Sequence, residues 1–329
     1  MALPFILGAA ALFGAAKTVD ALDDMSTAKR INREAQDLVD RNKRWIENAR
    51  NSTDSAIKEL GKTKISIMSG SMKKFVDSFS RIKNVDLSEL PGAEKLRGFN
   101  PGSQEFLNMK NASFKASELA TGGIGALSAG ALTAAGAYGA VGAFAAASTG
   151  TAISALSGAA ATNATLAWLG GGALAAGGGG MAAGTLVLGG LVAAPALLVG
   201  GFFLGSKAET ALNDARANKA QAEQFGAECD KMYAVLSAIK ERGEQLNSLL
   251  YRLDEKFRPA VTDMISVVEY SGTNWRTYDR DSKKRVMLAA NIAQTLKIVL
   301  DTTLLTKDGS VTSESGRALE TGLAALASL

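Results

Sequence analysis

The chain carries few of the residue types on which enzymes and metal sites depend. It has no histidine and a single cysteine, Cys229, so His-dependent triads, His/Cys zinc sites and a disulfide within the chain are excluded. Cys229 falls on the apolar side of a predicted helix, where a thiol packs as a small hydrophobic group. The carboxylates, including the neighbours Asp23 and Asp24, lie among charges on predicted helix faces. We therefore expect no enzyme, no metal site and no cofactor.

Two glycine runs, at residues 170–172 and 177–180, invite comparison with phosphate-binding loops. Such a loop follows a strand and continues into Lys and then Ser or Thr, and neither run has this context. The basic residues are not clustered among aromatic side chains either. We therefore expect neither a nucleotide nor a nucleic acid as a ligand.

The small residues favour close packing between helices instead. Glycine or alanine recurs at four-residue spacing, which in lipid lets helix backbones approach each other. Trp168 stands alone among small residues, and an indole favours the interface between membrane and water. Simple packing is the alternative for this residue. The residues expected to insert or pack in the membrane are Gly130 (with Ala134), Gly139 (with Ala135), Trp168, Gly180, Gly184, Gly201 and Gly205.

All of these residues belong to one uncharged segment. Residues 119–206 form a stretch of 88 residues without Asp, Glu, Lys or Arg, and it holds 22 of the 35 glycines. Only a bilayer or a core sheltered by polar helices tolerates such a stretch. Breaks divide it into candidate helices near 119–147, 151–161, 164–176 and 181–205, of which the first and last are long enough to cross a bilayer. Membrane insertion is favoured, and a buried Gly/Ala-rich core is the alternative.

Two polar arms flank this segment. Residues 19–82 and the region from Lys207 to Pro259 keep apolar residues at three- and four-residue spacing, with charged residues on the opposite face. This pattern predicts long amphipathic helices, and their length favours coiled-coil-like packing. We expect the two arms to pair antiparallel, which would bring both ends of the uncharged segment together. A kink is expected near Pro259.

Turn and cap residues mark the shorter elements. Residues 84–103 predict a break with a short helical piece inside it, and a new helix starts near Gln104. Further along the chain the pattern predicts a loop at 270–274, a helix over 279–301, a turn at 307–309 and a tail helix from about Thr312. Since no strand pattern appears, the expected fold is all-α, with four parts: an apolar N-terminal helix (1–18), an N-terminal arm (19–118), the uncharged helical hairpin region (119–206) and a C-terminal arm and tail (207–329).

The net charge of the two arms and the composition of the N-terminus indicate where the protein is located in the cell. Residues 1–118 have a net charge of +4 and residues 207–329 a net charge of zero. This small excess of positive charge would assist an approach to anionic lipid, where each nearby Lys or Arg contributes about 1 kcal/mol of binding free energy. The first sixteen residues are apolar but lack a basic start and are short for a membrane span, which is not typical of a secretory signal. We expect a membrane-associated protein, or a cytoplasmic one that inserts conditionally; the sequence does not clearly indicate secretion, and a signal peptide is the alternative for the apolar start.

Residues 157–201, SGAAATNATLAWLGGGALAAGGGGMAAGTLVLGGLVAAPALLVGG, lie between heptad-like arms. This stretch resembles a widespread and poorly characterised family of bacterial glycine-zipper helical proteins, and the segments ARANKAQAEQ and MLAANIAQTLKIVLDT extend the similarity. The architecture is also similar to that of α-helical pore-forming toxins and apolipoprotein-L-like proteins. The resemblance implies an apolar hairpin kept against amphipathic helices until a trigger releases it, and it implies no catalytic residue.

Three functional hypotheses remain open. The first is a pore-forming or membrane-permeabilising toxin or defence effector, with a lipid bilayer and further copies of the chain as partners. The second is a constitutive multi-span membrane scaffold whose coiled-coil arms bind other proteins. The third is a soluble structural protein with a Gly/Ala-rich core.

Overall fold

The computed structural model describes residues 5–90, 96–120, 208–306 and 309–329. Every regular element in this part is a helix, and its only β-type pairings are two isolated bridges, so the prediction of an all-α fold is confirmed. The described residues divide into two compact units. The first contains α1 up to Asn51 and the start of α8 up to Leu236, and the second contains the described residues from Ser52 to Ala120 and from Ser237 onward.

The first arm is one helix with a change of pitch near its end. Helix α1 spans Phe5–Ile67, a π-helical turn, η1, spans Met68–Met72, and α2 spans Lys73–Phe79. The sequence predicted helix from residue 19 to residue 82, and α1 continues N-terminally through the apolar start without a break at residue 18.

The second arm, α8, spans Ala208–Tyr270 and is longer than predicted, because it continues through Pro259. Proline has no N–H to donate, so the Glu255 carbonyl loses its partner one turn earlier. Both residues are exposed, and water can hydrogen-bond that carbonyl on the solvent side. The proline therefore does not end the helix.

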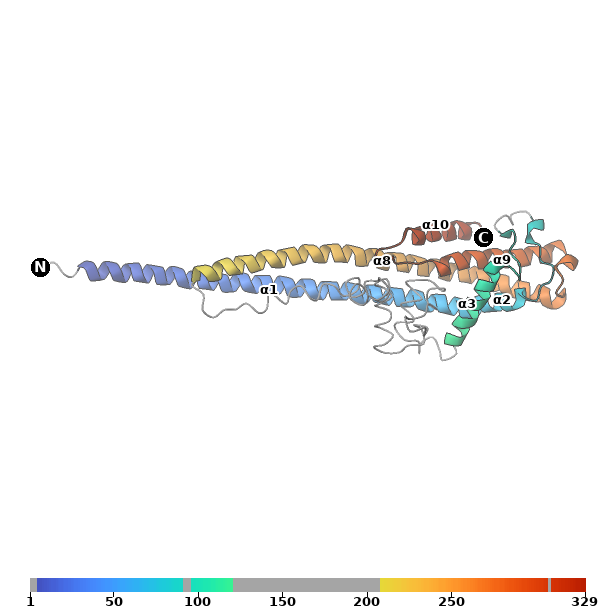
Figure 1. Ribbon diagram of the computed structural model, residues 1–329, viewed down its shortest axis with the longest axis horizontal. Helices are drawn as coiled ribbons and strands as arrows, with labels where there is room; N and C mark the ends of the chain where they lie inside the picture. The colour runs from blue at the N-terminus through green and yellow to red at the C-terminus, as the bar shows by residue number, and fades with distance from the viewer. Residues whose placement is uncertain (1–4, 91–95, 121–207, 307–308) are drawn as a thin grey trace, which may run out of the picture. The chain divides into compact units, whose positions relative to one another are not determined.

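In the first unit, α1 and α8 lie side by side and run in the same direction (Figure 1). The Nδ2 of Asn218 donates to the Oδ1 of Asn32 at 2.9 Å, and further along both helices the Trp45 and Tyr233 rings stack with centroids 4.3 Å apart. The antiparallel pairing expected from the sequence is therefore wrong. An apolar stripe determines which face of a helix is buried, but it carries no information on the direction of the partner.

Small and medium side chains fill the seam of the first unit. Its buried cluster consists of Ala35, Val39, Ile46, Ala222, Phe225 and Cys229. The burial predicted for Cys229 is confirmed. Burial raises the pKa of its thiol, and the neighbouring carboxylates of Asp230 and Glu228 raise it further. This cysteine is therefore a packing residue and is not activated as a nucleophile.

The second unit holds the larger core. Here too the helices run parallel, since the Phe75 ring packs against Phe257 (5.7 Å between centroids) and, further along the chain, Lys83 pairs with Asn274 in an isolated parallel bridge. Three more helices pack in this unit: α3 (Gln104–Ala120), α9 (Arg280–Asp301) and α10 (Ser313–Ala327). Their predicted starts are confirmed.

Side-chain caps explain why α9 and α10 start where the sequence indicated. Asp279 accepts a hydrogen bond from the Ser282 N–H at 2.7 Å, and Thr312 accepts one from the Ser315 N–H at 3.0 Å. Each bond satisfies a donor that would otherwise be unpaired in the first helical turn.

The predicted breaks are confirmed as well. The first contains a short 3₁₀ turn, η2 (Leu87–Glu89), and the second is followed directly by η7 (Trp275–Thr277). Gly98 and Gly272 both have φ of 80°, a conformation that glycine adopts without strain. At the predicted turn near residue 309, Leu305 pairs with Val311 in an antiparallel bridge, and residues 307–308 lie outside the description.

Residues 121–207, with almost all of the uncharged segment, lie outside the described part, and so do the four helices predicted within it. Among the helices of the described residues, none combines the length and the apolar character that crossing a bilayer requires.

Candidate functional site around α3

The residues proposed for membrane packing are not placed by the structure. Gly130, Gly139, Trp168, Gly180, Gly184, Gly201 and Gly205 all lie within 121–207, outside the described residues. The structure does place α3, the helix that leads directly into this segment. The candidate site is the surface of the second unit on which α3 docks.

Aromatic side chains form the first part of this docking surface. Phe106 of α3 packs against three rings: Phe79 at 5.4 Å, Phe99 at 5.9 Å and Phe75 at 6.4 Å between centroids. All four side chains are 3% exposed or less. Edge-to-face and tilted ring pairs of this kind add about 0.5–1.5 kcal/mol each beyond the burial of their surface. The N-terminal half of α3 is therefore firmly attached.

The π-helical turn η1 forms the second part. A π-turn contains one more residue than an α-turn, so it rotates the apolar stripe that follows it. Ser71 in this turn donates to Asp254 Oδ1 at 2.5 Å, and Arg258 Nη2 approaches Asp254 Oδ2 at 2.6 Å. The Asp254 carboxylate is buried, and these two partners offset the loss of its hydration.

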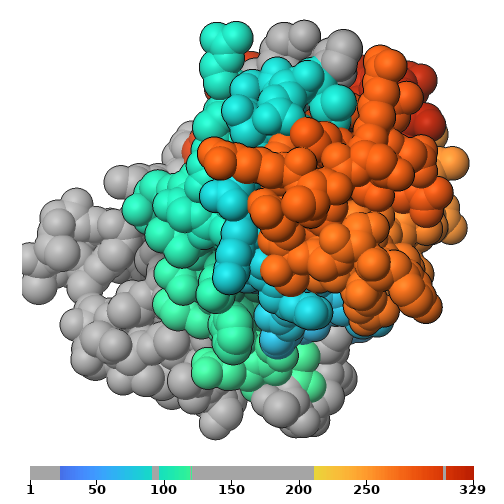
Figure 2. Space-filling view, turned by 90° about the vertical axis from the view of Figure 1, so that its right-hand side faces the viewer, coloured from blue at the N-terminus to red at the C-terminus, as the bar shows by residue number. Residues whose placement is uncertain are grey.

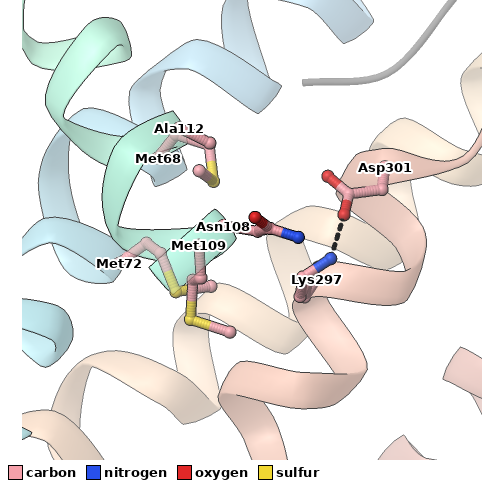
Figure 3. Close-up of a pocket in the computed structure, with 7 residues that line it drawn as sticks. All are labelled: Met68, Met72, Asn108, Met109, Ala112, Lys297 and Asp301. Atoms are coloured by element: carbon pink, nitrogen blue, oxygen red, sulfur yellow. Dashed lines mark hydrogen bonds and ion pairs between the residues drawn. The ribbon is translucent and has the colours of Figure 1, made fainter. Parts of the chain in front are cut away.

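Next to η1, methionine side chains line a small cavity (Figure 3). Met68, Met72 and Met109 lie on one side, and Asn108 of α3 points toward Lys297 and Asp301 of α9. The cavity measures about 10 Å³, which is room for roughly one water molecule. It is a packing gap at the α3–α9 contact and is too small for an organic ligand.

Polar groups complete the contact between α3 and α9. Gln294 of α9 donates to Glu105 of α3 at 3.3 Å, and beside it the Lys297 ammonium pairs with the Asp301 carboxylate within α9. A shallow hollow of about 320 Å³ adjoins this pair and is lined by α3, α9 and α10. Its mixed carboxylates and cations, among them Glu314 and Arg317, favour no ligand charge.

Lys64 is the most unusual charged residue of the unit. It is 1% exposed, and its Nζ donates to the backbone oxygen of Thr302 at 3.1 Å. Burial lowers the pKa of this ammonium to about 7, against a smaller opposing effect of Asp301. A cation near the last carbonyls of a helix is favourable, so Lys64 holds the C-terminal end of α9 against α1.

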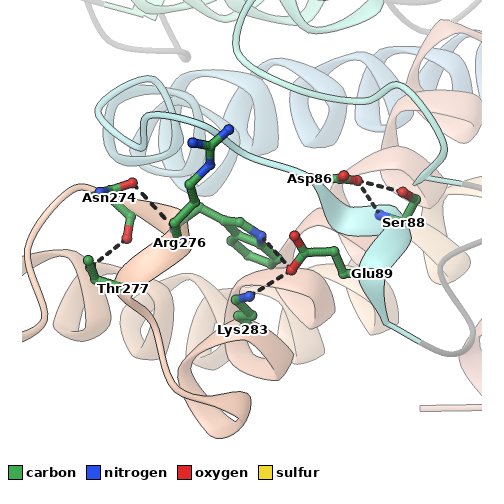
Figure 4. A network of polar contacts seen from close by, with 8 residues as sticks. Asp86, Ser88, Glu89, Asn274, Arg276, Thr277 and Lys283 are labelled. Carbon is green, nitrogen blue, oxygen red and sulfur yellow. Dashed lines mark hydrogen bonds and ion pairs between the residues drawn. The ribbon is translucent and has the colours of Figure 1, made fainter.

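A second polar network joins the loop after α2 to the start of α9 (Figure 4). Glu89 accepts from Lys283 at 2.6 Å and from the Trp275 indole N–H at 3.3 Å. The Lys283 ammonium is the main cause that lowers the pKa of Glu89. Trp275 itself is fully buried, so it anchors both loops at this end of the unit.

The geometry around α3 supports attachment of this helix to the second unit. Within the described residues, no group of three or more Cys, Asp or Glu side chains lies close enough to hold a metal ion. Sequence reasoning did not identify Lys64, although a signal was present: it stands four residues from both Leu60 and Met68, on the apolar stripe of α1. A lysine at such a position is a candidate buried cation.

No family model matches this chain, and it has no significant similarity to a curated protein or to a solved structure. The resemblance to glycine-zipper helical proteins thus stays an expectation based on residues 157–201.

Proposed function

We propose that this protein is a membrane-inserting helical protein whose uncharged segment, residues 119–206, enters a lipid bilayer and permeabilises it. A toxin or a defence effector is the corresponding role. The observation that carries the proposal is the run of 88 residues without a charge. Small residues at four-residue spacing would let inserted helices associate, between copies of the chain or within one.

The packing of the arms supports insertion over a sheltered core. In the first unit the apolar stripe of α1 is buried against that of α8, and in the second unit both helices contribute to one core with α3 and α9. The large apolar side chains that remain exposed in the described part are scattered over several helices. These helices therefore offer no continuous stripe that could cover 88 further apolar residues.

The docking of α3 supports the idea that the uncharged segment is restrained from inserting. This helix ends where the uncharged segment begins, and its aromatic, methionine and polar contacts attach it to η1, α2 and α9. In this proposal the docked α3 limits how far the segment can reach toward a membrane, and its release increases insertion.

A constitutive multi-span scaffold is the second candidate. The same burial of the α1 and α8 stripes favours it, because arms that are already paired leave the segment without the shelter that a soluble resting state needs. In that case the segment would lie in lipid from the start, and the arms would bind other proteins.

Fractionation followed by dye release from liposomes distinguishes the candidates. A permeabilising protein is recovered at least partly without detergent and releases trapped dye, and a scaffold fractionates with membranes and resists alkaline extraction. Phe106→Ala should loosen α3 and raise the rate of dye release severalfold. Asn111→Ala, on an exposed position of the same helix, is the matched control.

Protein that stays beside liposomes and never releases dye, with or without Phe106→Ala, would reject permeabilisation. Equal release by wild type, Phe106→Ala and Asn111→Ala would show that α3 docking does not restrain the segment.

A further inference from the structure

The structure brings together a positively charged surface that the linear sequence conceals. It lies at the end of the second unit where α2 ends and α8 turns into α9 (Figure 2). The described residues there are 81–90, 96–99 and 269–285, and they contain eight Lys or Arg against five Asp or Glu. We name this region the end surface.

Backbone hydrogen bonds join its two segments, which are about 190 residues apart in the chain. Lys83 N–H donates to the Thr273 carbonyl at 2.7 Å, and Trp275 N–H donates to the Lys83 carbonyl at 3.0 Å. These bonds hold Lys83 next to Arg276. Arg81 lies near the same loop, because its charge acts on the Tyr278 hydroxyl, whose pKa is raised mainly by burial and lowered by this cation.

The carboxylates of the end surface are mostly engaged within the protein. Asp86 accepts from the Ser88 N–H and hydroxyl, and Asp279 caps α9. Glu89 pairs with Lys283, and Asp281 pairs with Arg285. Of the five carboxylates, only Glu269 has no such partner among the described residues.

The cations are engaged far less. Arg81, Lys83, Arg97, Arg276, Arg280 and Lys284 are all exposed, and none of them forms an ion pair within the described part of the chain. Figure 4 shows the Arg276 side chain directed away from the Glu89 network. The end surface therefore has a positive excess of eight Lys or Arg over five Asp or Glu, and six of its cations are exposed and available to contact an anionic ligand.

An exposed aromatic residue lies beside these cations. Tyr270, the last residue of α8, is 88% exposed. Tyrosine is enriched at the level of lipid headgroups, where its ring contacts the acyl boundary and its hydroxyl stays hydrated. Buried Trp275 holds the adjacent loop in place, so the cations need little ordering when they bind.

We propose that the end surface docks the protein on membranes that contain anionic lipid, with Arg81, Lys83 and Arg276 as its central contacts. Each cation near an anionic bilayer strengthens binding about fivefold. The docking is peripheral and electrostatic, so it does not require the uncharged segment to insert. The function proposed above can therefore fail without affecting this inference.

Co-sedimentation with vesicles tests the proposal on the full chain. The probes are vesicles of phosphatidylcholine with about 30% phosphatidylglycerol and vesicles of phosphatidylcholine only, each at low and high salt. The variant Arg81→Gln/Lys83→Gln/Arg276→Gln should weaken binding to the anionic vesicles on the order of 100-fold. The matched control Lys74→Gln/Arg252→Gln/Lys256→Gln removes the same charge from exposed positions elsewhere in the unit and should bind nearly as wild type does.

Three results would overturn the proposal: equal loss of binding in both triple variants, equal binding to neutral and anionic vesicles, or binding that high salt does not weaken. Tight binding of an oligonucleotide that displaces the vesicles would assign the surface to nucleic acid instead. Circular dichroism of both variants confirms that they remain folded, and dye release measured on the same samples reports insertion separately.

Discussion

Lys64 makes the stability of the second unit depend on pH in a direction opposite to that of most lysines. Its pKa is about 7 in the folded protein because of burial, against 10.5 for an unperturbed lysine. Between these values the unfolded chain holds the proton and the folded protein has released it. The unfolded state then binds more protons, so the free energy of unfolding rises with pH.

The magnitude follows from the difference between the two pKa values. One pKa unit corresponds to about 1.4 kcal/mol, so the full effect is on the order of 5 kcal/mol between pH 7 and pH 10.5. From pH 7 to pH 9 the expected gain is about 2 kcal/mol. Below pH 7 lysine is protonated in both states, and its contribution no longer changes with pH.

The assay is urea unfolding followed by circular dichroism between about pH 6 and about pH 9, a range that avoids most tyrosine ionisation. Lys64→Met should abolish the rise with pH that wild type shows, since methionine fills the space without a proton to release. Lys74→Met, at an exposed position of α2, should leave the rise unchanged. Lys64→Arg should destabilise the unit by several kcal/mol, because a guanidinium keeps its charge when buried.

Parallel pH profiles for wild type and Lys64→Met would refute the reasoning. They would mean that Lys64 keeps its proton in the folded protein, with hydration or further partners that stabilise the ammonium.

Two further predictions concern helix packing. Gly322→Ala should destabilise the attachment of α10 by about 1–3 kcal/mol, because a Cβ there would lie 2.5 Å from a methyl carbon of Leu249. At Gly316 an added Cβ would meet only the flexible end of the Arg242 side chain, so Gly316→Ala should be nearly neutral, and thermal unfolding of both glycine variants measures the difference. Asn218→Val should cost about 1–3 kcal/mol because it leaves the Asn32 amide without its partner, and adding Asn32→Val should restore most of the loss. Equal stability of the single and double variants would contradict a specific role for this pair.

Local chemistry allowed the helix boundaries to be predicted well. Asp279 and Thr312 have side chains that satisfy the first N–H groups of a helix, and such caps depend only on neighbouring residues. The predicted apolar stripe of α8 is likewise buried, including Cys229. By contrast, α8 continues past Pro259, where the predicted helix of the second arm ended, because solvent outside the helix can replace the hydrogen bond that proline removes.

Features that depend on distant residues were not predictable. The parallel direction of α1 and α8 depends on contacts such as Asn32 with Asn218, and the burial of Lys64 depends on the Thr302 carbonyl. The end surface combines Lys83 with Arg276 across about 190 residues of chain. The apolar periodicity of one helix does not specify which other segment packs against it or in which direction.

Caps and periodicity act over a few residues, so the all-α character of the described chain, most helix starts and the buried helix faces could be read from the sequence. The uncharged segment on which the proposed function depends is visible there as well. The direction of the long helices, the docking of α3, the burial of Lys64 and the gathering of cations at one end became visible in the three-dimensional structure alone. These features arise from packing and electrostatics between residues that are close in space and far apart in the chain.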